Sequence, residues 1–286
     1  MKLPFEIDLK NQVAVITGAA GVIPSCISRA VAQCGAKVFL LDINEQKLEE
    51  TARNIESEGL KAYPIICDVL NRSMLEKAFD NMMEIAGPCN ILINGAGGNN
   101  PRATTTSEIY QIGQDTSEKT FFDIKMEDFL QTLNLNFIGT VLPVQIFGRE
   151  MIENPNTHPN KVILNISSMN AFIPLTKIPA YSAAKSAVSN FTHWLSVYFA
   201  EANVRVNAIA PGFLSTEQTK ALFYEEDGIT PTKRLNKILA STPLGKLGKP
   251  EELIGTILWL LSQEASSFVT GAVIPIDGGF SSYSGV

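Results

Sequence analysis

The chain has 286 residues, of which 45% are hydrophobic and 18% are charged, which is the composition of an ordinary globular protein. Its formal net charge of −6, with no basic cluster along the sequence, argues against nucleic acid or an anionic membrane as a partner. Residues 1–6 lack the apolar core of a signal peptide and the four cysteines form no Cys-x-x-Cys pair, so we expect a cytoplasmic chain with reduced thiols. The two histidines, His158 and His193, belong to no ligand cluster, so we expect no metal site.

Seven short apolar runs alternate with helical patterns along the chain. The runs lie at residues 13–16, 38–41, 63–66, 91–93, 162–164, 204–206 and 273–276, and helices are expected at 24–34, 45–58 and 73–85. Because the runs are nearly all apolar and β-branched, they fit strands that are buried on both faces of a parallel sheet. We therefore predict an α/β fold of the Rossmann type, in one domain over residues 1–286. Its doubly wound, seven-stranded, mostly parallel sheet would carry helices on both faces.

Two long stretches interrupt this alternation, at about residues 98–125 and 213–244. The first is polar and rich in Asn and Thr, and the second has helix-forming pieces broken by Gly228, Pro231 and Pro243. Both follow strands, and in an open α/β sheet ligands bind outside the carboxyl ends of the strands. We expect substrate loops or lids here; the alternative is plain surface decoration.

A glycine-containing turn at residues 17–24 follows the first strand. Such a turn brings backbone N–H groups and a helix N-terminus to a pyrophosphate. Asp42 follows the second strand, where a carboxylate accepts hydrogen bonds from the adenosine ribose and repels a 2′-phosphate, so we predict NAD as the cofactor rather than NADP. The alternative for Asp42 is a helix N-cap.

Further residues at strand ends complete the predicted cofactor site. Asp68 closes the third strand and can contact adenine, residues 94–97 offer a floor of small side chains, and Pro211-Gly212 makes a turn near the nicotinamide end. The predicted cofactor-binding residues are Gly18, Ala20, Gly21, Val22, Ile23, Asp42, Asp68, Val69, Asn94, Gly95, Ala96, Tyr181, Lys185, Pro211 and Gly212.

Tyr181 and Lys185 are four residues apart, so on a helix their side chains lie on one face. A nearby ammonium stabilises phenolate, and we expect Lys185 to lower the pKa of Tyr181 below its usual value of about 10. A tyrosine shifted in this way acts as a general acid or base near neutral pH, and the Ser168 hydroxyl can hydrogen-bond a substrate oxygen. A bare Tyr-x-x-x-Lys pair is more often a solvated helix face, but the rest of the chain favours the catalytic interpretation.

Taken in order, these motifs resemble the short-chain dehydrogenase/reductase family over nearly the whole chain. The matching segments are Thr17-Gly18, Asn94-Gly95-Ala96-Gly97, Asn136-Phe137-Ile138-Gly139, the set Ser168, Tyr181 and Lys185, Pro211-Gly212, and Asp277-Gly278-Gly279. The resemblance implies catalytic roles for Ser168, Tyr181, Lys185 and Asn136, with Asn136 holding a water that relays protons to Lys185. It also implies a homo-oligomer, a tetramer or a dimer, in which the helix after Tyr181 packs between subunits.

The phosphate turn departs from the pattern of the family. The second and third glycines of the motif fall on Val22 and Pro24, while a glycine appears one place early, at Gly21. Proline at the first helical position is compatible with helix initiation. Val22 adds bulk where backbone normally approaches the pyrophosphate, so we expect the geometry of this loop to differ.

The segment at residues 95–105, with the long insertion after it, resembles the D-mannonate oxidoreductases (fructuronate reductases). That resemblance implies reversible hydride transfer between NADH and the keto carbon of D-fructuronate, with Tyr181 as the proton donor. A uronate needs a cation and polar groups, and the candidate substrate-binding residues are Asn99, Arg102, Asn170 and Lys177. For Arg102 and Lys177 the alternative is a solvated surface position.

Three other functions stay open from the sequence. A gluconate 5-dehydrogenase-like activity is a close alternative, and a 3-oxoacyl carrier reductase is a further one, although Asp42 and the Asn-rich insertion argue against the latter. A non-catalytic NAD-binding sensor is disfavoured, because it would not need Ser168, Tyr181, Lys185 and Asn136 together.

Overall fold

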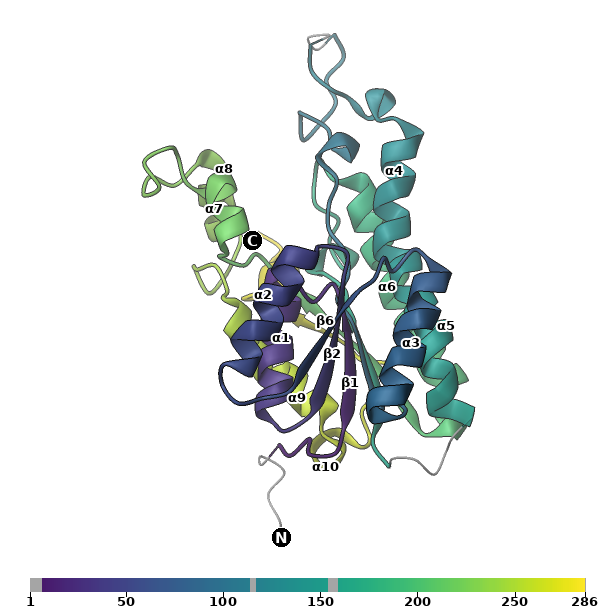
Figure 1. The fold of residues 1–286 in the computed structure, drawn as a ribbon. Coiled ribbons are helices and arrows are strands. Elements are labelled where there is room, and N and C mark those ends of the chain that lie inside the picture. The colour runs from purple at the N-terminus through teal and green to yellow at the C-terminus, as the bar shows by residue number, and fades with distance from the viewer. Residues whose placement is uncertain (1–6, 114–116, 154–158, 286) are drawn as a thin grey trace.

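A parallel sheet of seven strands forms the centre of the computed structural model, which describes residues 7–113, 117–153 and 159–285 (Figure 1). The expectations for residues 1–6 and for His158 lie outside the described residues. The strands are β1 Val13–Thr17, β2 Lys37–Asp42, β3 Ala62–Ile66, β4 Ile91–Asn94, β5 Lys161–Ile166, β6 Val204–Pro211 and β7 Val273–Ile276, in the order β3-β2-β1-β4-β5-β6-β7. All six neighbouring pairs are parallel, so the predicted strands and the Rossmann-type fold are confirmed.

Helices cover both faces of the sheet (Figure 1). On one face lie α1 Val22–Gln33, α2 Glu45–Glu56 and α9 Ile254–Leu261, and on the other lie α3 Arg72–Ala86, α5 Gly139–Glu153 and α6 Pro179–Tyr198. Side chains along β1 alternate between the two faces of the sheet. Ala14 and Ile16 belong to the core that includes α1, α2 and α9, and Val13 and Val15 belong to the core that includes α3, α5 and α6. The sheet is therefore buried on both faces, as its apolar strands predict.

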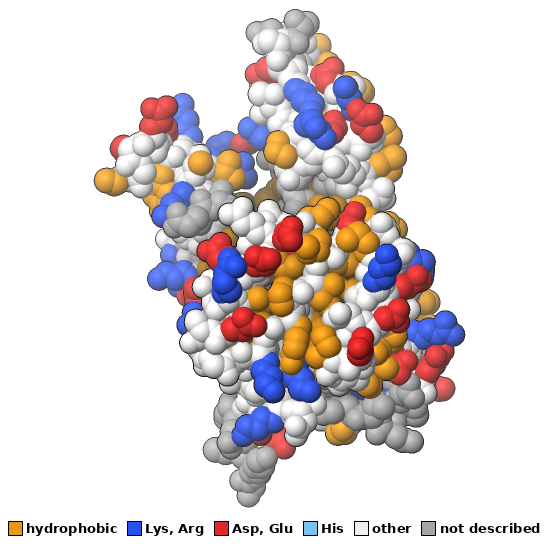
Figure 2. All heavy atoms as spheres, in the orientation of Figure 1, with side chains coloured by type: hydrophobic (Ala, Val, Ile, Leu, Met, Phe, Trp, Pro, Cys, Tyr) orange, Lys and Arg blue, Asp and Glu red, His pale blue; other side chains and the backbone are white. Residues whose placement is uncertain are grey.

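The two interrupting stretches form protrusions above the carboxyl edge of the sheet. One contains residues 98–113 and 117–125 together with α4 Met126–Leu133, and the other contains α7 Glu217–Phe223 and α8 Lys233–Ala240. Figure 2 shows them standing apart with a hollow between them. The α7–α8 unit has a small core of its own, made by Phe223, Leu235 and Ile238.

A π-helical turn, Asn134–Ile138, joins α4 to α5. Such turns are rare and often occur at functional sites, and this one carries Asn136. Within the described part of the chain, no helix has the length and apolarity that crossing a membrane requires.

Candidate active site

A cavity of about 700 Å³ runs along the carboxyl edge of the sheet, beneath the hollow between the protrusions. This is the edge where ligands bind in open α/β sheets. Most of the predicted cofactor residues line the cavity: Gly18, Gly21, Val22, Ile23, Asp42, Asp68, Val69, Gly95, Ala96, Tyr181, Lys185 and Gly212. Ala20, Asn94 and Pro211 are not among its lining residues.

The turn after β1 is held by very close backbone packing. Gly18 has φ +67°, and a Cβ there would lie 2.6 Å from Ala96 Cα. A Cβ on Gly95 would lie 2.7 Å from both Pro24 Cγ and the Thr17 carbonyl oxygen, so the proline ring fills the space above Gly95. These two positions accept no side chain without a shift of backbone or ring, so the turn after β1 and the segment after β4 pack directly against each other beside the cavity.

The expected position of Pro24 was wrong by two residues. Helix α1 begins at Val22, with Gly21 as its N-cap, so Pro24 is the third residue of the helix and not the first. It is tolerated because the first four N–H groups of a helix have no partner within the helix.

Asp42 joins the phosphate turn to β2. Its Oδ2 accepts a hydrogen bond from the Ala20 N–H at 3.0 Å, and its Oδ1 accepts one from the Asn44 N–H at 2.8 Å. The alternative that Asp42 is the N-cap of the next helix is wrong, because the Asn44 side chain caps α2 by accepting from the Lys47 N–H. Asp42 also lines the cavity, so this residue both holds the turn and borders the cavity.

The predicted floor at residues 94–97 is fixed from below. Asn94 is buried, and its Nδ2 donates to Asn165 Oδ1 at 2.8 Å, which ties β4 to β5. The Thr17 hydroxyl oxygen accepts from the N–H groups of Gly95 and Ala96 at 3.1 and 3.2 Å. Asn94 therefore supports the floor without lining the cavity.

Lys185 is buried beside Tyr181 near the first turn of α6. Its Nζ donates to the Ile166 carbonyl oxygen at 2.7 Å and lies 5.6 Å from the centroid of the Tyr181 ring. Burial lowers the pKa of Lys185 to about 8. The lysine is therefore mostly charged at pH 7 but loses its proton more easily than an exposed lysine.

The expectation for the pKa of Tyr181 was wrong for the protein on its own. Burial raises the pKa of Tyr181 to about 12, and a hydrogen bond with the Ser168 side chain only partly offsets this. Removing a phenolate from water costs more free energy than the hydrogen bond with Ser168 returns. In the free protein the tyrosine is thus a protonated hydroxyl at neutral pH, next to the hydroxyl of Ser168.

Asn136 meets Lys185 across Gly97. Its Nδ2 donates to the carbonyl oxygens of Gly98 and Thr132, both at 2.8 Å, and its Oδ1 accepts from the Gly98 N–H at 3.1 Å. A Cβ on Gly97 would lie 2.5 Å from Asn136 Oδ1 and 3.3 Å from Lys185 Nζ. The amide and the ammonium therefore approach one glycine, and the π-helical turn holds the amide there.

The predicted substrate residues are placed differently from one another. Asn170 is 2% exposed, its N–H donates to Ser168 Oγ at 3.3 Å, and its Oδ1 has no partner among the described atoms. Asn99 Nδ2 donates to Thr104 Oγ1 at 3.4 Å, within its own loop. Lys177 has φ +71°, a backbone conformation that few residues other than glycine adopt. None of the four predicted residues is among those lining the 700 Å³ cavity.

Arg102 is already paired, contrary to the expectation of an open carboxylate clamp. Its Nε donates to Asp128 Oδ1 at 2.6 Å, and its Nη2 donates to Gln131 Oε1 at 3.3 Å. Both partners belong to α4, so the guanidinium connects the insertion to this helix. The sequence did not reveal this, because Asp128 lies 26 residues away in a helix that was not predicted.

The cavity also has a wall that sequence reasoning missed. Gln131 and Leu135 contribute from the α4 side, and Phe213, Leu214, Thr216, Thr219 and Phe223 contribute from the second protrusion. The only signal in the sequence was the position of the loop at residues 213–244 after a strand. Among the described residues, no group of three or more His, Cys, Asp or Glu side chains is placed to hold a metal ion.

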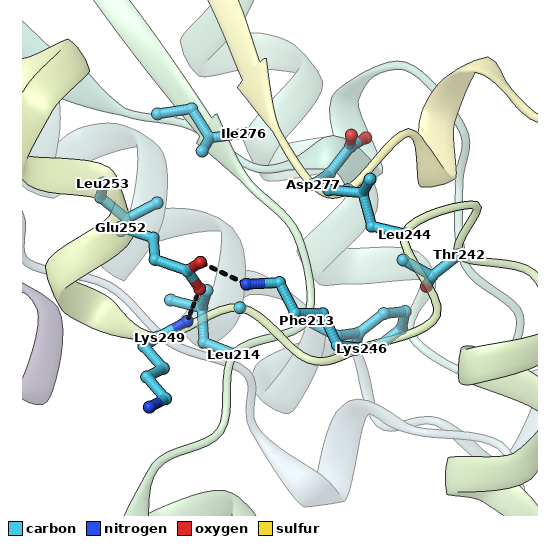
Figure 3. Close-up of a pocket in the computed structure, with 12 residues that line it drawn as sticks. Phe213, Leu214, Thr242, Leu244, Lys246, Lys249, Glu252, Leu253, Ile276 and Asp277 are labelled. Atoms are coloured by element: carbon cyan, nitrogen blue, oxygen red, sulfur yellow. Dashed lines mark hydrogen bonds and ion pairs between the residues drawn. The ribbon is translucent and has the colours of Figure 1, made fainter.

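A second cavity, of about 240 Å³, lies where the α7–α8 unit joins the body of the protein (Figure 3). Phe213 and Leu214 line both cavities. The two acidic residues that line the smaller cavity already accept hydrogen bonds from the protein. Glu252 accepts from Lys246 and from the Lys249 N–H, and Asp277 accepts from two backbone N–H groups. Neither Tyr181 nor Lys185 lines it, so the larger cavity is the candidate active site.

Two curated proteins and one crystal structure are similar to the chain over almost all of its length. A protein of Haemophilus influenzae named "Uncharacterized oxidoreductase" is 45% identical over 286 residues, covering 100% of this chain and 99% of that protein. "Uncharacterized oxidoreductase UxuB" of Bacillus subtilis is 44% identical over 284 residues, covering 99% and 100%. The crystal structure of "a putative D-Mannonate oxidoreductase from Haemophilus influenza", with bound NAD, is 45% identical with a TM-score of 0.94, and covers 100% of both chains.

The sequence profile of the family described as short chain dehydrogenase matches residues 12–227. The match includes the phosphate turn, Asp42, Asn136 and the set Ser168, Tyr181 and Lys185. Together with the two relatives above 40% identity, it shows that the chain belongs to the short-chain dehydrogenase family.

Proposed function

We propose that the protein is an NAD-dependent oxidoreductase that interconverts D-mannonate and D-fructuronate. One observation carries the proposal: Tyr181, with Ser168 and Lys185 beside it, borders a cavity whose other end is formed by the glycine turn and Asp42. The proposed proton donor and the proposed dinucleotide site therefore line the same cavity. The likeness to the Haemophilus structure named for D-mannonate supports the choice of substrate.

The chain's own residues fit NAD. The cavity volume lies within the range of small-molecule sites, and the N-terminus of α1, at Gly21 and Val22, lines it and would suit a pyrophosphate. The Asp42 carboxylate would accept from the adenosine ribose and repel a 2′-phosphate, which favours NAD over NADP. When bound, the nicotinamide supplies or accepts the hydride.

Ser168 and Tyr181 handle the substrate oxygen in this proposal. Because burial keeps Tyr181 protonated at neutral pH, its hydroxyl can donate a proton to the oxygen of a ketone as that oxygen gains charge. Ser168 donates a hydrogen bond to the same oxygen and orients the carbonyl. The Lys185 ammonium then stabilises the phenolate that remains, and Asn136 holds the loop of Gly97 and Gly98 against that lysine.

Asn170 and Lys177 are the better substrate-binding candidates of the predicted four. The buried Oδ1 of Asn170 has no partner among the described atoms and lies two residues from Ser168, where a sugar hydroxyl could donate to it. Arg102 would have to leave Asp128 before it could bind a carboxylate.

We also propose a cytoplasmic homo-oligomer that packs through α6. Trp194 and Tyr198 are 55% and 68% exposed and stack with ring centroids 4.7 Å apart, next to the exposed Val197. A row of exposed apolar side chains of this kind is typical of a protein interface.

Steady-state oxidation of NADH with D-fructuronate, 5-ketogluconate and tagaturonate tests the proposed function. We expect D-fructuronate with NADH to give the highest kcat/KM and NADPH to give much less. A preference for 5-ketogluconate would favour the gluconate 5-dehydrogenase-like alternative. NADH binding without turnover of any keto sugar would favour a sensor.

A further inference from the structure

An ion pair spans the two protrusions above the cavity. Lys237 Nζ, on α8, lies 3.0 and 3.1 Å from the two carboxylate oxygens of Glu108 in the insertion. The two residues are 129 positions apart, and the pair joins segments whose helices otherwise stand apart (Figure 1). Helix α8 packs on α7, whose Phe223 lines the cavity, so the pair lies one helix away from this wall of the candidate active site.

Lys177 is a second cation whose charge acts on the same carboxylate, from a backbone segment that is hydrogen-bonded to the insertion. The pKa of Glu108 is lowered first by its hydrogen bond and charge contact with Lys237, and further by the charge of Lys177. The Lys177 carbonyl oxygen accepts from the Thr105 N–H at 2.9 Å, which ties the segment before Tyr181 to the insertion. A third segment of the chain thus adds the positive charge of Lys177 near the pair that Lys237 and Glu108 form between the protrusions.

Stability does not explain this cluster. The side chains of Lys237 and Glu108 are 69% and 44% exposed, and exposed ion pairs contribute little to folding because water and salt screen them. Lys177, in contrast, keeps a backbone conformation with φ +71°, which costs free energy for a side chain with a Cβ. Strained residues of this kind are concentrated at ligand sites.

We propose that Lys177 and Lys237 bind the carboxylate of an anionic substrate, and that the Glu108 carboxylate occupies this place in the free protein. The inference rests on the proposed function, since it requires a substrate that carries both a carbonyl for Tyr181 and a carboxylate. Glu108 has the same functional group as the substrate carboxylate, and its partial exposure lets it turn into solvent when it is replaced.

Two substitutions have opposite consequences in this arrangement. Lys237→Met removes a ligand of the substrate carboxylate, and it should raise KM for the anionic substrate roughly tenfold, the usual effect of losing one charged hydrogen bond. Glu108→Gln removes the competing carboxylate while keeping the size of the side chain, and it should lower that KM. If the ion pair only held the two protrusions together, both substitutions would break it, and KM would change in the same direction in both variants.

The experiment measures kcat and KM with NADH for D-fructuronate and for the neutral ketose D-fructose in the wild type, Lys177→Met, Lys237→Met and Glu108→Gln. Lys233→Met is the matched control, because it removes an exposed lysine from the same helix. We expect the ratio of kcat/KM for the anion to that for the neutral sugar to fall in both other lysine variants, to rise in Glu108→Gln and to hold in Lys233→Met.

If the ratio of kcat/KM changed in the same direction in Glu108→Gln and Lys237→Met, the inference would be overturned, and the ion pair would only hold the two protrusions together. An unchanged ratio in Lys177→Met would also overturn it. If the wild-type protein reduced only neutral ketones, the proposed carboxylate site would be wrong, but the proposed oxidoreductase activity would stand. A wild-type protein that binds NADH but reduces no ketone would instead contradict the proposed function itself.

Discussion

Lys185 Nζ lies 5.6 Å from the centroid of the Tyr181 ring, and it donates its hydrogen bond to the Ile166 carbonyl oxygen rather than to the tyrosine hydroxyl. The two side chains share one face of α6, yet burial shifts their pKa values toward the neutral forms, to about 12 for Tyr181 and about 8 for Lys185. A charged lysine next to a neutral tyrosine at pH 7 is suited to donating a proton and then stabilising the phenolate.

The lowered pKa of Lys185 predicts a pH dependence of folding stability. Between about pH 8 and the unfolded pKa of about 10.4, the unfolded chain holds a proton on this lysine that the folded protein has lost. Stability contributed by this group therefore rises with pH in that window, and below pH 8 its burial is a constant cost. Relative to Lys185→Met, the wild type should gain roughly 2 kcal/mol of unfolding free energy between pH 7 and 9.5.

Chemical denaturation of both proteins at several pH values measures this difference. The cysteines titrate in both and cancel in the comparison. A constant difference from pH 7 to 9.5 would mean that Lys185 keeps an ordinary pKa in the folded protein.

Gly95→Ala should damage the cofactor turn, because the new Cβ would lie 2.7 Å from Pro24 Cγ and from the Thr17 carbonyl oxygen. We expect a loss of about 1–3 kcal/mol in stability and weaker NADH binding. Gly98→Ala is the matched control in the same loop, since a Cβ there meets nothing within 4 Å. Thermal unfolding and titration of NADH fluorescence check both variants, and equal effects would contradict the close packing of Gly95 against Pro24.

Asp42→Ala should weaken NADH binding by about tenfold and raise the affinity for NADPH relative to NADH. In the proposed function, the change removes the acceptor for the ribose and the charge that repels a 2′-phosphate. Asp68→Ala is the control, because it removes another acid that lines the cavity and should leave the preference between the two cofactors intact. Fluorescence titrations with both cofactors decide this, and an unchanged ratio in Asp42→Ala would refute the assignment.

Arg102→Ala should lower stability more than it affects substrate binding. It leaves Asp128, which is 5% exposed, as a buried carboxylate without its guanidinium, at a cost of about 1–3 kcal/mol. The double variant Arg102→Ala/Asp128→Asn should recover part of that loss. Should Arg102→Ala instead raise KM for a uronate more than tenfold with no change in melting temperature, the arginine would be a substrate ligand after all.

The sheet was predictable from the sequence because its strands are short, apolar and β-branched, and lie where expected from Val13 to Ile276. The helices α4, α5 and α9 were not predicted. Helix α4 has only eight residues, Pro143 lies inside α5, and Ile254–Leu261 is almost wholly apolar and has no polar face to reveal a helix.

The site was predictable only where sequence order fixes position. The shared helix face of Tyr181 and Lys185 follows from helical spacing, and the residues after the strands line one cavity because the strand ends meet at one edge of the sheet. The pKa of Tyr181, the pairing of Arg102 with Asp128 and the bridge from Glu108 to Lys237 depend on burial and on contacts between distant segments. No local pattern contains that information.

Turnover of D-fructuronate with NADH by the wild type and by Tyr181→Phe tests the central claim most directly. We predict that the wild type oxidises NADH and that Tyr181→Phe loses about 10²- to 10⁴-fold in kcat while still binding NADH, because the ring is kept and the proton donor is removed. Near-normal turnover by Tyr181→Phe would contradict the account.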